Sequence, residues 1–164
     1  MAKDKLKIRR YEAKDNAAAK ELNYAGLEQM RPDIDWKGIG VADGDYDDIE
    51  NIYINSWGDF LVGTVNGEVV VTGAVKKLDE NCGEIKRIRV KPECQRRGYG
   101  EAMTKALIKR AEELGYKKIR IDTMTTNTRA QALFNKTGFK EAYHGKIGEF
   151  EVIFYFMELK GKER

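Results

Sequence analysis

A short basic stretch between residues 95 and 100 is the part of this sequence best suited to chemistry. It reads Gln95-Arg96-Arg97-Gly98-Tyr99-Gly100, follows a run typical of a strand and precedes a pattern typical of a helix. Glycine lets backbone amides approach a ligand closely, and the amides of a first helical turn have no partner within the helix. Because two arginines add positive charge, the stretch predicts a site for phosphates, above all a pyrophosphate.

Three common ligand-binding motifs fit the chain poorly. A dinucleotide-binding G-x-G-x-x-G would need glycine where Met103 stands, and no P-loop G-K-[ST] follows the stretch. The acidic run from residue 43 fails as an EF-hand, because Asp48 and Ile54 occupy the positions that require glycine and glutamate. The phosphate site is therefore predicted outside these three classes.

Hydrophobic periodicity predicts strands and helices that would hold this stretch in place. The expected strands cover residues 6–11, 60–64, 68–76, 84–90, 118–123, 139–142 and 152–159. The expected helices cover residues 14–30, 99–114 and about 127–137, with a short helix near 45–53. The run 152–159 is apolar on both faces, so we expect it inside the sheet. This order predicts an α/β fold, a mixed sheet with helices on its faces.

Composition indicates one ordinary globular domain over residues 1–164. A hydrophobic content of 41% and a charged content of 35% argue against wholesale disorder. No apolar run reaches membrane-spanning length, and the first residues lack the apolar core of a signal peptide. We therefore expect a cytoplasmic protein with no membrane partner.

Metal and nucleic-acid sites are not expected. Cys82 and Cys94 show no metal-ligand spacing, which favours two reduced thiols, and His144 is the only histidine. The net charge of +3 gives no global positive field for nucleic acid. Binding through the basic segment would instead predict strongly salt-dependent retention on DNA or RNA.

Charge is nevertheless segregated along the chain, with basic residues at 86–97 and acidic residues at 33–50. The acidic stretch could attract a cationic amine, or it could be a solvated loop. The interleaved aromatics could wall that amine's site, or they could cover the sheet. These aromatics are Trp36, Tyr46, Tyr53 and Trp57. In the basic stretch we favour phosphate binding for Arg96 and Arg97, and solvent or acceptor contact for Lys86 and Arg87.

Four coinciding features resemble the GNAT N-acetyltransferase superfamily. The glycines follow a strand and open a helix, and residues 95–100 fit the pattern [Q/R]-x-x-G-x-[G/A]. A second unit follows at the right distance, Asn127-x-x-Ala130-x-x-Leu133-Phe134-x-Lys136-x-Gly138-Phe139, and Glu84 begins the preceding strand. The resemblance is sharp over residues 83–139 and extends as strand order over nearly the whole chain.

The resemblance implies a mixed, mostly antiparallel sheet flanked by helices and a site for acetyl-CoA as co-substrate, with no metal. The pyrophosphate would bind at Gln95, Arg96, Arg97, Gly98, Tyr99 and Gly100. The backbone of Ile88, Arg89 and Val90 would pair with the pantetheine arm, and an N–H near Val90 would stabilise the oxyanion. Asn127 would bond the pantetheine amides, and Phe134 would flank the same arm.

The resemblance also implies acetyl transfer to a primary amine by direct attack in a ternary complex. Such an amine has a pKa of about 10.4 and must lose a proton. Glu84 occupies the position of the base in some members, although it could simply bond Lys86 or Arg87. The tyrosine that often protonates the leaving thiolate is Phe134 here. Either the thiolate leaves unassisted, or Tyr143 or another tyrosine substitutes, or acyl-CoA is bound without turnover.

The sequence leaves the acceptor open. It would be the amine of a small molecule or peptide, and the acidic stretch leans toward a small cationic amine. The alternative function is a non-catalytic acyl-CoA-binding or regulatory module, which Phe134 alone favours. Dimers are common in the family, so the resemblance leaves a homodimer open.

Overall fold

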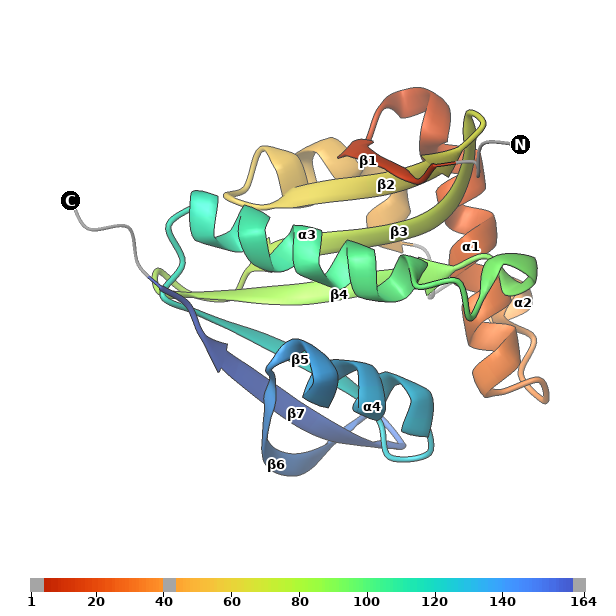
Figure 1. Ribbon diagram of the computed structural model, residues 1–164. Coiled ribbons are helices and arrows are strands. Elements are labelled where there is room, and N and C mark those ends of the chain that lie inside the picture. The colour runs from red at the N-terminus through yellow and green to blue at the C-terminus, as the bar shows by residue number, and fades with distance from the viewer. Residues whose placement is uncertain (1–4, 40–43, 161–164) are drawn as a thin grey trace.

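The fold is built on one seven-stranded sheet in the order β1-β2-β3-β4-β5-β7-β6. The computed structural model describes residues 5–39 and 44–160 (Figure 1). The strands are β1 (Lys7–Arg10), β2 (Asp59–Val65), β3 (Glu68–Lys77), β4 (Cys82–Val90), β5 (Lys118–Met124), β6 (Lys140–Ile147) and β7 (Phe150–Glu158). Within the described residues only β4 and β5 pair in parallel, so the mixed, mostly antiparallel sheet is confirmed.

Helices cover both faces of the sheet. The longer ones are α1 (Asn16–Met30), α3 (Tyr99–Glu113) and α4 (Thr128–Thr137). Shorter turns are α2 (Trp36–Ile39), η1 (Ala13–Asp15), η2 (Gly44–Asp48), η3 (Glu50–Ile54) and η4 (Pro92–Cys94). No helix in the described parts of the chain is long and apolar enough to cross a membrane.

Two hydrophobic clusters divide the core between these faces. Leu61 joins the cluster beneath α3 and α4, whereas its neighbours Phe60 and Val62 join the cluster beneath α1, η2 and η3. Alternate residues of a strand point to opposite faces, so the two clusters lie on opposite sides of the sheet. Figure 1 shows α3 and α4 on the near face.

The predicted elements agree with the structure except at their ends and in the region after α1. The prediction that 152–159 is interior is confirmed, because β7 lies between β5 and β6. Strand β6 runs to Ile147, five residues past the predicted end, because it pairs with β7 along that length. The short helix expected near 45–53 is confirmed as one unbroken helical stretch over residues 44–54, in which the 3-10 helix η2 runs directly into the π-helix η3.

Strands β4 and β5 pair at their N-terminal ends and then diverge. They pair only over residues 82–84 of β4 and 118–120 of β5, and Figure 1 shows them diverging beyond that point. A register shift opposite Gly73 marks a β-bulge in β4, where Arg87 has a φ of 61°. The split leaves the edge of β4 from residue 85 to 90 without a strand partner on the β5 side.

A buried carboxylate connects the β1 edge of the sheet to helix α3. Asp59, at the start of β2, accepts hydrogen bonds from Arg10 of β1 at 3.0 Å and from Arg110 of α3 at 2.7 Å. Its side chain is only 2% exposed. The ion pair therefore joins the sheet edge to the helix that covers it.

Candidate active site

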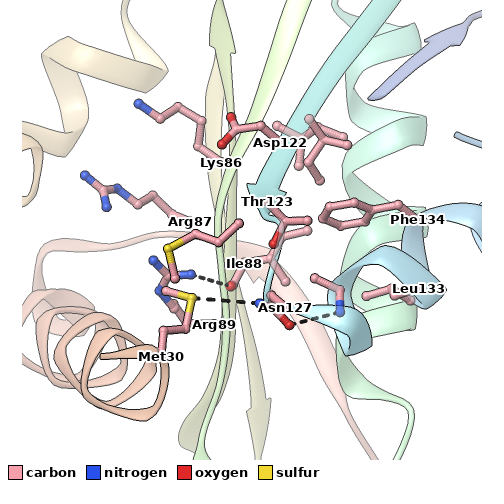
Figure 2. A pocket seen from close by; sticks show the side chains of 14 residues that line it. Met30, Lys86, Arg87, Ile88, Arg89, Asp122, Thr123, Asn127, Leu133 and Phe134 are labelled. Carbon is pink, nitrogen blue, oxygen red and sulfur yellow. Dashed lines mark hydrogen bonds between the residues drawn. The ribbon is translucent and has the colours of Figure 1, made fainter. Parts of the chain in front are cut away.

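A groove follows the gap between β4 and β5. It consists of an inner cavity of about 200 Å³ and an outer cavity of about 650 Å³. Figure 2 shows the inner cavity, with side chains of β4 on one side and those of β5 and α4 on the other. The two cavities share the residues Met30, Ile88, Arg89, Asn127, Ala130 and Leu133. The groove is therefore continuous from the outer mouth to the inner end.

The outer cavity lies at the N-terminus of α3. Gly98, Tyr99 and Gly100 line it, and Gly98 is the N-cap residue with a φ of 84°. A side chain at Gly98 would be strained by this left-handed conformation. No side chain caps α3, so the amides of its first turn are free to meet an anion. These features suit a pyrophosphate, the ligand that the sequence predicts for this loop.

The basic residues of the loop differ in position. Arg96 lines the outer cavity and is exposed, whereas Arg97 is exposed and lines neither cavity. Gln95 also lines the outer cavity, and its amide bonds Gln29 of α1 at 2.9 Å and Arg129 of α4 at 2.8 Å. Arg129, which the sequence did not single out, brings a second guanidinium to this cavity.

The open edge of β4 forms one wall of the groove. Ile88 and Arg89 line both cavities, and Val90 lines the outer one. Because this part of β4 lacks a partner on the β5 side, its backbone groups there can pair with an extended ligand. The three residues named from the sequence thus lie together along the groove.

Asn127 lies where the two cavities meet. Its Oδ1 accepts a hydrogen bond from the Ala130 amide at 3.2 Å and so caps α4. Its Nδ2 lies 3.8 Å from the Met30 sulfur, a weak acceptor. The amide N–H groups of Asn127 are therefore available for a stronger acceptor, such as a carbonyl oxygen of a ligand.

Phe134 lines the inner cavity and also belongs to the core. Its ring is 5% exposed and lies edge-on to Tyr155, with 5.5 Å between ring centroids. No tyrosine is among the described residues that line the inner cavity. Tyr143, considered from the sequence as a substitute, lies on β6, half-exposed and stacked on Phe154.

Glu84 lies just beyond the groove. It is the last β4 residue paired with β5, and it lines neither cavity. Its carboxylate accepts hydrogen bonds from Nε of Arg120 at 3.0 Å and from the Nη2 of the same residue. Lys86 Nζ lies 3.8 Å away. The sequence suggested Lys86 or Arg87 as the partner of Glu84, but in the structure the hydrogen-bonded partner is Arg120.

Asp122 of β5 is the carboxylate that lines the inner cavity. Burial raises its pKa, and the negative charge of Glu84 raises it further. The described residues offer it no hydrogen-bond or ion-pair partner within bonding distance. Nothing in the sequence singles out Asp122 beyond its place near the end of a predicted strand, because its exposure to the cavity depends on the divergence of β4 and β5.

Three cationic side chains of β4 face the α1 side of the inner cavity. Lys86, Arg87 and Arg89 all line it, because the bulge changes the alternation of side chains along the strand. Arg87 forms a two-pronged ion pair with Asp45 of η2, at 2.9 and 2.8 Å. Burial lowers the pKa of Lys86.

Part of the acidic stretch is neutralised by the chain itself. Asp45 bonds Arg87, Asp33 bonds Arg31 at 2.7 Å, and Asp47 bonds Lys20 at 2.8 Å. Asp43 lies outside the described residues. Three of the seven acidic residues in the stretch 33–50 are thus paired within the chain, and attraction of a cationic acceptor by the others stays a prediction.

The aromatic residues of the same region divide into two groups. Tyr46 and Tyr53 are buried edge-on against Phe60 and cover the sheet. Trp36 lies 6.2 Å from Phe150, between ring centroids, and so links α2 to the start of β7. Trp57 is 70% exposed and lines a separate surface hollow.

Comparison with known proteins points to one family. The profile of the Acetyltransferase (GNAT) family matches residues 28–139. An uncharacterized N-acetyltransferase of Schizosaccharomyces pombe is 36% identical over 69 residues. That alignment covers 40% of this chain and 42% of the relative, so the chain spans less than two thirds of that protein's length.

Solved structures share the fold. An acetyltransferase of the GNAT family from Staphylococcus aureus superposes with a TM-score of 0.81 at 22% identity, covering 95% of this chain and all of the other. The Salmonella typhimurium protein yncA, solved with its cofactor acetyl-CoA, superposes with a TM-score of 0.76 at 20% identity over 94% of both chains. At these identities the likeness concerns the fold.

Proposed function

The chain belongs to the acetyltransferase (GNAT) family, and we propose that it transfers an acetyl group from acetyl-CoA to a primary amine in a ternary complex. The observation that carries the proposal is the continuous groove between β4 and β5. It joins an uncapped helix N-terminus, suited to phosphates, to an inner cavity lined by an unpaired carboxylate. Acetyl-CoA supplies the activated acyl group, and the chain supplies its binding and the removal of a proton.

The residues of the outer cavity would hold acetyl-CoA. The amides of residues 98–100 and the charges of Arg96 and Arg129 face the expected pyrophosphate, with Arg97 adding charge from outside the cavity. The open edge of β4 at 88–90 would pair with the pantetheine amides, and Asn127 would donate to one of them. An N–H near Val90 would face the developing oxyanion.

Asp122 is our choice for the group that takes the amine proton. It faces the inner cavity, and its raised pKa makes it a better base than an ordinary aspartate. Glu84 stays a candidate from the sequence, but its carboxylate bonds Arg120 and lies outside the cavity. We propose that Glu84 acts through Asp122, by raising the pKa of that carboxyl, and so is a positioning residue.

No tyrosine hydroxyl is proposed for the leaving sulfur. The inner cavity offers Phe134 at that position, and a thiol with a pKa of about 8.5 leaves as a thiolate without an acid. The same observation supports the second candidate, an acyl-CoA-binding module without turnover.

The test is thiol release from acetyl-CoA with a panel of primary amines, alongside calorimetric binding of acetyl-CoA. We expect amine-dependent release by the wild type and at least tenfold weaker acetyl-CoA binding by Gly98→Glu, because a strained carboxylate would face the phosphates. Lys109→Gln, an exposed change on α3, should match the wild type. Normal acetyl-CoA binding by Gly98→Glu would rule out the loop as the phosphate site. Binding of acetyl-CoA without release from any amine would favour the binding module.

A further inference from the structure

Arg89 is a cation with only neutral partners. Its Nε donates to Asn23 Oδ1 at 3.2 Å, and its Nη1 donates to the Ile88 carbonyl at 3.3 Å. Within the described parts of the chain, no carboxylate lies within ion-pair distance of this guanidinium. Its strand neighbour Arg87 has such a partner in Asp45. Figure 2 shows Arg89 beside Met30, at the border of the inner cavity.

The surroundings of Arg89 offer neutral acceptors and, among the described residues, no carboxylate within ion-pair distance. Burial lowers the pKa of this guanidinium, a sign that the protein around it solvates the charge poorly. The Tyr46 hydroxyl, close enough for Arg89 to influence its pKa, is a buried donor with no partner among the described residues. A charge held in such a place is costly unless an anion joins it.

The position of the Arg89 side chain is also fixed. A Cβ at Gly26 of α1 would come within 2.6 Å of Arg89 Cδ, so only glycine leaves room for the arginine stem between α1 and β4. Arg89 pairs with Thr72 across the sheet and contacts α1, on the face opposite α3. The guanidinium is thus held against the groove rather than free to turn into solvent.

The inner cavity as a whole favours an anionic group. Lys86 and Arg89 line it against the single carboxylate of Asp122, while the third lining cation, Arg87, is already paired with Asp45. Asp122 and Arg89 line the same inner cavity, whose volume is about 200 Å³. An anion at Arg89 and an amine near Asp122 would therefore fit into one small ligand.

Resting on the proposed function, we propose that the acceptor is a small amino acid and that Arg89 binds its carboxylate while its amine faces Asp122. A guanidinium donates two parallel hydrogen bonds to a carboxylate, and such charge-assisted pairs are the strong ones. A peptide N-terminus carries no carboxylate beside its amine and would leave Arg89 unpaired. Free amino acids are thus favoured over peptides and polyamines.

The phosphates of acetyl-CoA are a less suitable partner for Arg89. The predicted phosphate site has its own donors at the N-terminus of α3. It lies on the α3 face of the sheet, toward which the side chains of Ile88 and Val90 also point. Arg89 contacts Asn23 and the space beside Gly26 on the α1 face. Its guanidinium is therefore better placed for a second substrate that enters from the α1 side.

The test compares each active amino acid with its amide and its decarboxylated amine in the thiol-release assay. We expect the wild type to prefer the carboxylate form in kcat/KM by at least about tenfold, the effect of one charge-assisted pair. Arg89→Gln should lose this preference, because its kcat/KM falls for the amino acid and stays within about threefold for the amide. Arg89→Lys should keep part of it, and Lys109→Gln should keep all of it.

Two further measurements separate the alternatives. Acetyl-CoA affinity should be unchanged in Arg89→Gln, and a loss of affinity with equal losses for all acceptors would reassign Arg89 to the cofactor. If Arg89→Gln does not fold, binding of reaction products to the wild type tests the inference instead. The wild type should bind the N-acetyl amino acid more tightly than the amide of that N-acetyl amino acid. Transfer to amines without carboxylate preference overturns this inference only. Absence of transfer to any amine overturns the proposed function and this inference together.

Discussion

At the scale of single residues, the contrast between Glu84 and Asp122 decides how the amine would lose its proton. Both are carboxylates on neighbouring strands, yet only Asp122 lines the cavity and lacks a bonded partner in the described chain. The pKa of Asp122 responds to burial first, then to Glu84, and is lowered again by Arg120, Lys86 and Arg89. Catalysis should therefore depend on this whole group of charges.

We predict that kcat/KM falls as the pH drops through the raised pKa of Asp122, because the protonated acid cannot accept the amine proton. Asp122→Asn should lower kcat/KM by about 10²–10⁴-fold and remove this acidic limb. Glu84→Gln should move the limb to lower pH, because it removes a charge that raises the pKa of Asp122. Rates measured from pH 4 to 9 check this. If Glu84→Gln abolished activity and Asp122→Asn did not, the two roles would be exchanged.

At the scale of elements, the sequence predicted those features of the fold that depend on local residue patterns, such as helix ends and strands. Gly98 and Gly138 mark helix ends by their left-handed conformation, and the apolar run 152–159 indicates an interior strand. Neither the cavity position of Asp122 nor the Arg87–Asp45 pair could be predicted. The first depends on where two strands separate, and the second joins residues 42 positions apart through a bulge.

The ion pair between Arg87 and Asp45 should stabilise the bulge of β4. Burial acts to raise the pKa of Asp45, but the hydrogen bonds and charge of Arg87 outweigh it, and the Tyr53 hydroxyl adds a bond of 2.5 Å. We predict that Asp45→Asn lowers the free energy of unfolding by about 3–5 kcal/mol, because Arg87 is left buried and unpaired.

Chemical denaturation at several pH values checks this prediction. The pKa of Asp45 is lowered in the folded state, so its stabilisation is full above the unfolded pKa and is lost as pH falls through the folded value. The difference between wild type and Asp45→Asn should shrink in that range. Asp47→Asn, which removes an exposed partner of Lys20 from the same turn, should cost at most about 0.5 kcal/mol. Equal effects of the two variants would contradict the special role of Asp45.

At the scale of the whole molecule, long-range ion pairs connect the sheet to the helices that cover it. The two hydrophobic clusters each stabilise one face of the sheet. Asp59 bonds Arg10 at the sheet edge and Arg110 on α3, 51 residues along the chain. Because Arg10 is half-exposed, part of the pair's strength is lost to solvent. The remaining link still couples β1, β2 and α3.

We predict that Asp59→Asn lowers the free energy of unfolding by up to about 3 kcal/mol, since Glu113 is then the one acidic partner of Arg110 left among the described residues, and it is exposed. Glu113→Gln should change it by at most about 0.5 kcal/mol. Urea titrations of both variants provide the comparison. A cost for Glu113→Gln that equals that of Asp59→Asn would mean that the exposed pair, and not the buried one, anchors α3.

The separation of β4 from β5 has a consequence for thermal stability as well as for binding. A ligand in the groove touches strands on both sides of the split, so it adds cohesion where the sheet itself supplies none. A ligand that binds only the folded chain raises its stability by RT ln(1 + [L]/Kd), about 2.7 kcal/mol at a hundredfold excess over Kd. The melting temperature of this protein should therefore rise with every tenfold increase in the concentration of free acetyl-CoA. It would report how strongly the groove binds its ligand.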